Sequence, residues 1–196
     1  MPSRIIMLLL LLLLLSLPVS AHELHADGGF WDGFNHPVLG FDHLLAMLSV
    51  GILSTQLGRS AIWSVPLAFL FFMTLGAVAG MSLMPIPFVE SGIALSVLLL
   101  GLAIALNREM PISFAMAFVG VFALFHGHAH GVEMPELARP SIYAMGFLLG
   151  TAAIHVAGVI IGSLINPDGK RKRVVQLMGS AIALVGSYLT LELWLA

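Results

Sequence analysis

Long apolar blocks alternate with short polar segments along most of this chain. After a leucine-rich start, six such blocks occupy residues 37–57, 62–84, 88–106, 111–129, 140–165 and 174–195. At ~1.5 Å per residue, a helix made from each block can cross a hydrocarbon core ~30 Å thick. The blocks lack the two-residue alternation of membrane β-strands. The pattern therefore predicts an all-α polytopic membrane protein with a six-helix transmembrane bundle.

The leucine-rich start is typical of a secretory signal peptide. Arg4 precedes an unbroken apolar run from Ile5 to Leu15, and the sequence Val19-Ser20-Ala21 provides small residues for cleavage. We therefore expect residues 1–21 to be a cleaved signal peptide and residues 22–196 to form the six-helix transmembrane domain. The alternative is an uncleaved first helix.

Composition supports the membrane assignment and limits the chemistry. Of the 196 residues, 59% are hydrophobic and only 9% are charged, and the mean hydropathy is +1.04. This composition is typical of an integral membrane protein surrounded by lipid. The net charge of -2 gives no electrostatic basis for binding nucleic acid. The absence of cysteine excludes disulfides and thiolate metal ligands.

The distribution of basic residues predicts the orientation. An exported N-terminus places six cationic residues in the inner loops, against Arg139 alone in the outer loops. This bias follows the positive-inside rule. We therefore expect a bacterial cytoplasmic (inner) membrane protein whose mature N-terminus and C-terminus both lie on the periplasmic side. The six inner residues are Arg59, Arg108, Lys170, Arg171, Lys172 and Arg173.

The first block contains a polar motif that is unusual for a membrane span. His36, His43 and Met47 follow an i, i+7, i+11 pattern, which places them on one stripe of a helix that Pro37 would open. Asp42 lies beside this stripe of side chains. An ionised carboxylate inside the membrane needs a partner such as a metal or an imidazole N–H. The alternative is a structural Asp–His pair that joins two helices.

A second motif closes the fourth block and contains His126, His128, His130 and Glu133. If the helix continues, His126 and His130 share a face, Glu133 lies one turn further, and His128 points elsewhere. If Gly127 and Gly131 break the helix, an extended segment places all three imidazoles on one side. Either geometry provides at least two nitrogens and one carboxylate, so we interpret the motif as a metal site.

Four further residues are candidates for the same chemistry. His155 lies in the middle of the fifth block, where a core histidine bonded to a backbone carbonyl is the alternative. Glu90 is either a metal contact or a simple helix-start acid. Cleavage after Ala21 would make His22 the N-terminus, with His25 nearby at the outer mouth. With this topology the polar groups converge on the outer face, and His155 lies deeper.

Nitrogen and carboxylate ligands suit Ni²⁺, Co²⁺ or Zn²⁺ better than Mg²⁺ or Ca²⁺. We expect this ion to be a substrate, with no prosthetic group. The expected partners are therefore membrane lipid and a divalent metal ion.

At its two motifs the chain resembles the HupE/UreJ family of bacterial membrane proteins. The matching residues are His36-Pro37-x-x-Gly40-x-Asp42-His43-Leu44-Leu45-Ala46-Met47 and Phe125-His126-Gly127-x-Ala129-His130-Gly131-x-Glu133. The resemblance implies a secondary permease that takes up nickel or cobalt from the periplasm and supplies cytoplasmic metal-delivery proteins. It implies metal contacts at His36, Asp42, His43, His126, His130 and Glu133. Metal roles for His128 and His155 are predicted from the sequence pattern.

Two other classes of function compete with the permease. The chain has no phosphate-binding loop, so transport would draw on ion gradients or the membrane potential. The first alternative is an intramembrane zinc-dependent hydrolase, in which the His/Asp cluster activates a water molecule. The second is a metal sensor or receptor that binds without transporting.

Overall fold

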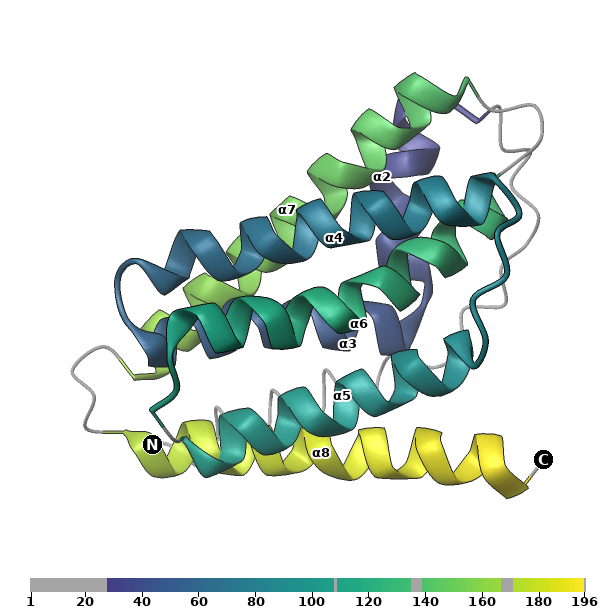
Figure 1. The fold of residues 1–196 in the computed structure, drawn as a ribbon. Helices are drawn as coiled ribbons and strands as arrows, with labels where there is room; N and C mark the ends of the chain where they lie inside the picture. The colour runs from purple at the N-terminus through teal and green to yellow at the C-terminus, as the bar shows by residue number, and fades with distance from the viewer. Residues whose placement is uncertain (1–27, 108, 135–138, 167–170, 196) are drawn as a thin grey trace.

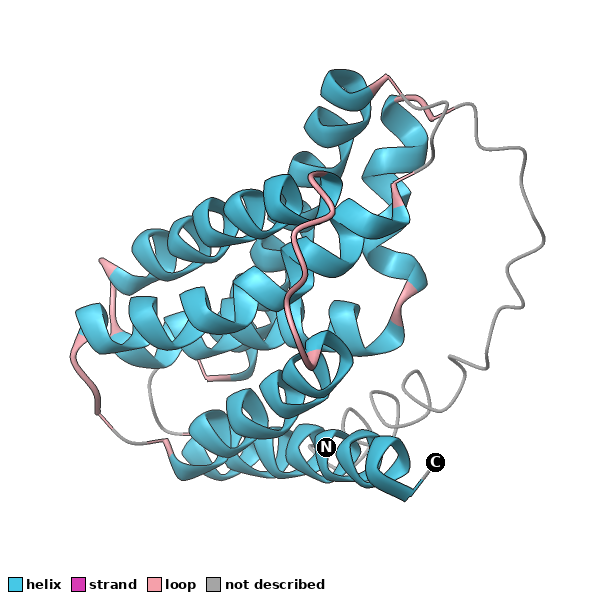
Figure 2. Cartoon of the chain, turned by 45° about the vertical axis from the view of Figure 1, so that its right-hand side comes forward, coloured by secondary structure: helices cyan, strands magenta, loops and turns pink. Residues whose placement is uncertain are grey.

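The computed structural model describes residues 28–107, 109–134, 139–166 and 171–195. Within these ranges all regular structure is helical, as Figure 2 shows. The predicted signal peptide, residues 1–21, lies outside the described residues, as do His22 and His25. The helices are α2 (Phe30–Leu39), α3 (Phe41–Leu57), α4 (Ala61–Met81), α5 (Val89–Leu106), α6 (Ile112–Glu133), α7 (Pro140–Ile165) and α8 (Lys172–Leu195).

The apolar blocks predict the long helices well. Five helices, α4 to α8, are long and apolar enough to cross a membrane, and their bounds lie within a few residues of the second to sixth blocks. The exception is α6, which continues beyond the predicted end at residue 129 as far as Glu133. The prediction of an all-α membrane protein is therefore confirmed at this level.

The first block differs from the prediction because it contains two helices. A break at Gly40 separates α2 from α3, and their axes are bent by 89°. Pro37 lies inside α2 and does not open a helix, because helical structure already begins at Phe30 in the preceding aromatic segment. The predicted single stripe through His36, His43 and Met47 is therefore wrong, because the break places His36 in α2 and the other two residues in α3.

The helices associate in closely packed groups. Helix α4 packs on α6, α5 packs on α8, and both α2 and α3 pack against α7; the first two pairs are seen side by side in Figure 1. Glycines make these approaches possible, since a Cβ at Gly127 would collide with the backbone of Met73 in α4, and one at Gly101 with that of Ala183 in α8. Small residues of this kind are typical of helix interfaces within membranes.

The contacts at these glycines also give the relative directions of the helices. Gly76 and Gly80 of α4 meet successive turns of α6 in ascending order, so α4 and α6 are parallel. The corresponding contacts make α3 parallel to α7 and α5 antiparallel to α8. These directions are those required of six successive crossings in which α2 and α3 together form the first.

Polar and apolar side chains are distributed as expected for a protein surrounded by lipid. Large apolar residues such as Trp63, Phe71 and Leu184 are exposed on the outside of the bundle, whereas His126 and His155 are buried inside it. Because lipid tails are as apolar as the side chains, the hydrophobic effect does not drive helices together within the membrane. Close packing and internal polar contacts are therefore the main stabilising interactions.

We predict that Gly127→Ala destabilises the protein by about 1–3 kcal/mol, the usual cost of overpacking a tight contact. The new methyl group would meet backbone atoms of Met73 and Ala77, which cannot rotate away, so α4 and α6 must separate. Unfolding in detergent micelles, followed by circular dichroism, measures this loss. Gly29→Ala is the matched control because a Cβ there meets nothing within 4 Å; equal losses in both variants would contradict the packing argument.

Candidate metal centre

The C-terminal end of α6 faces the bend between α2 and α3. Because α6 is continuous to Glu133, the helical alternative for the second motif is confirmed. His126 and His130 share a face, and Glu133 follows on the next turn. The intervening Gly127 and Gly131 contact α4 instead. The alternation of histidine and glycine thus gives α6 one polar face and one face for close packing.

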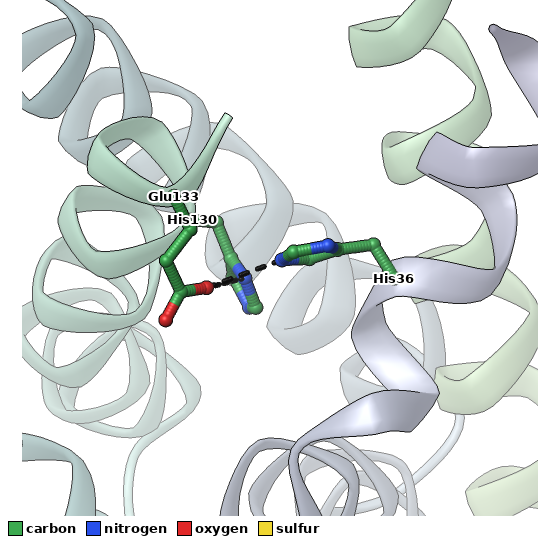
Figure 3. A group of neighbouring side chains, drawn as sticks. All are labelled: His36, His130 and Glu133. Atoms are coloured by element: carbon green, nitrogen blue, oxygen red, sulfur yellow. Dashed lines mark hydrogen bonds and ion pairs between the residues drawn. The ribbon is translucent and has the colours of Figure 1, made fainter. Parts of the chain in front are cut away.

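Three residues at the end of this face form a group with metal-ligand spacing. His36 Nε2 lies 3.2 Å from Glu133 Oε2, and His130 Nδ1 lies 3.5 Å from the same oxygen. One ligand atom from each residue lies within 4.8 Å of the others. Figure 3 shows the two imidazoles and the carboxylate directed toward one another. Glu133 is half-exposed, so the group opens toward the end of the bundle.

Two more histidines extend this group inward. The ring of His43 lies 4.4 Å from that of His130 and 4.9 Å from that of His126, between centroids. His36 contacts His130 at 4.9 Å. We call these four histidines, with Asp42 and Glu133, the imidazole cluster. The cluster joins α2 and α3, which carry the first motif, to α6, which carries the second.

Hydrogen bonds fix the tautomers of two of these imidazoles. Nδ1–H of His43 donates to Asp42 Oδ1 at 2.8 Å, and Nδ1–H of His126 donates to the carbonyl of Phe122 at 3.0 Å. Each Nε2 therefore carries a free lone pair, and both of these atoms are buried without a hydrogen-bond partner among the residues that the structure describes. Metal-binding histidines have this arrangement, with one ring N–H held by an oxygen and the other nitrogen left for the ion.

The position of Asp42 explains how a carboxylate is tolerated here. Asp42 lies in the first turn of α3, where the helix dipole favours a negative charge. Its Oδ1 also accepts the backbone N–H of His43 at 2.8 Å. The aspartate therefore orients the His43 ring and balances charge at the site. The predicted Asp–His pairing is present, although it joins neighbours on one helix.

His128 and His155 occupy different environments from the cluster. Nε2–H of His128 donates to the carbonyl of Met84 at 2.7 Å, which ties α6 to the segment between α4 and α5. His155 is 2% exposed, and neither ring nitrogen has a hydrogen-bond partner in the described ranges. The alternative for His155, a core histidine bonded to a backbone carbonyl, is therefore wrong.

The remaining predicted candidates lie apart from the cluster or pack beside it. Glu90 is exposed in the first turn of α5, as a helix-start acid would be. Met47 is completely buried in the hydrophobic core, one turn beyond His43 on α3.

The sequence motifs did not reveal the contribution of α7 and α4. Tyr143 contacts the ring of His36, and Phe147 contacts that of His130 at 4.7 Å. Tyr143, Phe147, Thr151 and His155 recur every four residues, which is a signal for one face of a helix. Phe69 of α4, which contacts His126 at 5.6 Å, has no comparable signal because phenylalanines are frequent in membrane spans.

These helices define an all-helical membrane protein whose interior contains the imidazole cluster. The chain belongs to the HupE/UreJ family, whose model matches residues 9–189. It is 44% identical over 179 residues to Protein HupE of Rhizobium leguminosarum bv. viciae, covering 89% of this chain and 92% of that protein. No solved structure matches the chain.

We predict that His126→Ala weakens Co²⁺ binding at least tenfold, whereas His128→Ala changes it less than twofold. The first variant removes a free Nε2; losing a metal-site interaction typically costs about 10- to 100-fold in affinity. The second removes only the bond to Met84, worth about 0.5–1.5 kcal/mol of stability. Titration of the purified protein with Co²⁺ measures both. Comparable losses in the two variants would place His128 among the ligands.

Proposed function

We propose that this protein is a secondary permease that takes up nickel or cobalt ions from the periplasm into the cytoplasm. The observation that carries the proposal is the pair of buried, unpartnered Nε2 atoms of His43 and His126, each with its Nδ1–H held by an oxygen. A buried polar atom left without a partner costs about 1–3 kcal/mol. A metal ion that binds these nitrogens removes that cost.

The ligand types limit the choice of ion. The imidazole cluster offers nitrogen and carboxylate donors, which favour Ni²⁺, Co²⁺ or Zn²⁺ over Mg²⁺ and Ca²⁺. His36, His130 and Glu133 form its half-exposed entrance, and His43 and His126 lie further in, with Asp42 orienting His43. We propose His155 as a contact on the inward route. Membership of the HupE/UreJ family supports a transport role.

The directions of the helices support six crossings. If α2 and α3 together form the first span, alternating crossings require α3 parallel to α7, α4 parallel to α6 and α5 antiparallel to α8, as observed. Cleavage of residues 1–21 would place the mature N-terminus in the periplasm, and six crossings return the C-terminus to the same side. The imidazole cluster then faces the periplasm in the cytoplasmic (inner) membrane.

The membrane potential is sufficient to drive this direction of movement. A divalent ion moving inward gains ~4.6 kcal/mol per 100 mV when the inside is negative. The site must bind moderately, because an ion held too tightly would not be released. Cytoplasmic metal-delivery proteins would keep the free ion concentration low after entry.

A cavity at the opposite end of the bundle supports an inward exit. Its volume is about 550 Å³, and it lies where α3, α5 and α7 end and α4 and α8 begin. Among the residues that the structure describes, its lining includes the polar Gln56, Asn107, Glu109 and Lys172 but no imidazole. Oxygen donors hold Ni²⁺ and Co²⁺ less strongly than imidazoles do, so an ion reaching this cavity exchanges readily with water. A zinc hydrolase would instead need a substrate cleft beside the imidazole cluster.

We expect proteoliposomes containing the wild-type protein to accumulate Ni²⁺ or Co²⁺ faster than empty vesicles when the lumen is negative. His43→Ala should abolish the difference, and Asp42→Asn should reduce binding affinity about 10- to 100-fold because His43 loses its orienting carboxylate. Asp32→Asn is the matched control, since among the described residues Asp32 of α2 bonds only the backbone N–H of Gly29, just before the helix. Wild-type vesicles that accumulate no more metal than empty ones would refute the permease.

The proposed topology is testable because the chain contains no cysteine. A membrane-impermeant maleimide should label Met84→Cys in intact spheroplasts, because Met84 is exposed between α4 and α5 on the periplasmic side. Ser60→Cys, exposed at the start of α4, should react only after the membrane is permeabilised. The reverse labelling pattern would overturn the orientation.

A further inference from the structure

Two buried polar residues of α7 lie beyond the imidazole cluster. Thr151 and His155 are one helical turn apart, so their side chains lie on the same face. Thr151 is completely buried and His155 is 2% exposed. Within the described part of the chain, Thr151 Oγ1 and both ring nitrogens of His155 have no hydrogen-bond partner. Three polar atoms are thus buried without the hydrogen bonds that usually compensate for the loss of water.

A structural role does not account for this pair. Buried imidazoles and hydroxyls in proteins are nearly always hydrogen-bonded, because leaving each one unpaired is costly. Ser49 and Ser54 in the neighbouring α3 follow that rule, since each hydroxyl donates to a carbonyl of its own helix. A neutral imidazole offers one lone-pair nitrogen of the kind that transition-metal ions accept, and the Thr151 hydroxyl oxygen offers a second donor beside it.

The ring of Phe69 contacts both His126 of the imidazole cluster and His155 of this pair. Its centroid is 5.6 Å from that of His126 and 5.1 Å from that of His155. Within the described ranges, the rings of His126 and His155 do not stack on each other, and Phe69 contacts both. Phe69 is itself completely buried, as part of the hydrophobic core.

We propose that Thr151 and His155 form a second, inner metal station, and that the phenyl ring of Phe69 is the barrier separating it from the imidazole cluster. The proposal rests on the permease function above. An ion on His126 Nε2 must pass the Phe69 ring to reach His155, and an apolar ring offers it no ligand in a low-dielectric interior. The ring therefore controls the rate of passage, while the imidazole cluster controls capture.

The inner station is tested by counting the Co²⁺ ions that the purified protein binds in equilibrium dialysis. The expected result is one fewer ion per chain in His155→Ala than in the wild type, with the tighter binding by the cluster unchanged. Thr151→Val should weaken the inner ion. Because Thr151 Oγ1 has no hydrogen-bond partner, this variant removes no structural bond, and its effect reports on the ion. An unchanged number of ions and unchanged affinities in both variants would overturn the station.

The barrier is tested by changing the size of residue 69 in both directions. Phe69→Leu removes the ring and should raise the initial rate of Co²⁺ uptake into proteoliposomes about tenfold, whereas Phe69→Trp should lower it about tenfold. A tenfold change corresponds to 1.36 kcal/mol in the barrier. Affinity for the first Co²⁺ should stay the same in both. Phe71→Leu is the matched control, because Phe71 lies on the same helix but faces outward, 60% exposed.

Opposite effects on rate distinguish a barrier from a packing role. A residue that only stabilises the fold would lose activity in both variants, together with unfolding stability, and that result would overturn the barrier. Rates equal to wild type in both variants would do the same. Either outcome differs from failure of the proposed function, in which the wild-type protein itself transports no metal.

Discussion

The bend between α2 and α3 is the feature on which the site depends. In a continuous helix, His36 and His43 would be seven residues and ~10.5 Å apart along the axis. The 89° break at Gly40 brings both rings within 5 Å of the ring of His130. A broken helix exposes backbone groups that lipid cannot satisfy, so such breaks are tolerated only inside a protein. Here α7 packs along both halves, and Asp42 accepts the His43 N–H at the start of α3. A Cβ at Gly40 would press on the His43 ring, which explains the need for glycine there.

Helix α6 couples packing to chemistry through its alternating residues. Its glycines let α4 approach backbone to backbone, which fixes the rotation of α6 about its axis. That rotation directs His126 and His130 away from α4's backbone and toward α2 and α3. The same approach places Phe69 of α4 beside His126. A change at Gly127 would therefore disturb the imidazole cluster without touching a ligand.

The sequence predicts what depends on local pattern. Hydropathy locates α4 to α8, and helical periodicity places His126 and His130 on one face because both properties repeat along a single element. The break at Gly40 escapes prediction because its backbone angles, φ -91° and ψ 116°, are open to any residue, and Pro37 resembles a helix start. The contact between His36 and His130 depends on how α2 and α6 pack. Phe69 has an ordinary identity for a membrane span, so only its contacts with His126 and His155 identify it.

The placement of charge gives the site a direction. Within the described helices, the carboxylates nearest the imidazole cluster are Glu133, half-exposed at the entrance, and Asp42, one step further in. At the proposed inner station, next to Phe69, the polar atoms are neutral: the ring nitrogens of His155 and the hydroxyl of Thr151. In the permease that we propose, charged ligands compensate a divalent ion more fully than neutral ones in a low dielectric, so binding would weaken from the entrance to the inner station. The ion would be captured where negative charge is available. A membrane potential negative inside would oppose its return, so weak inner ligands would favour release into the cytoplasm over escape to the periplasm.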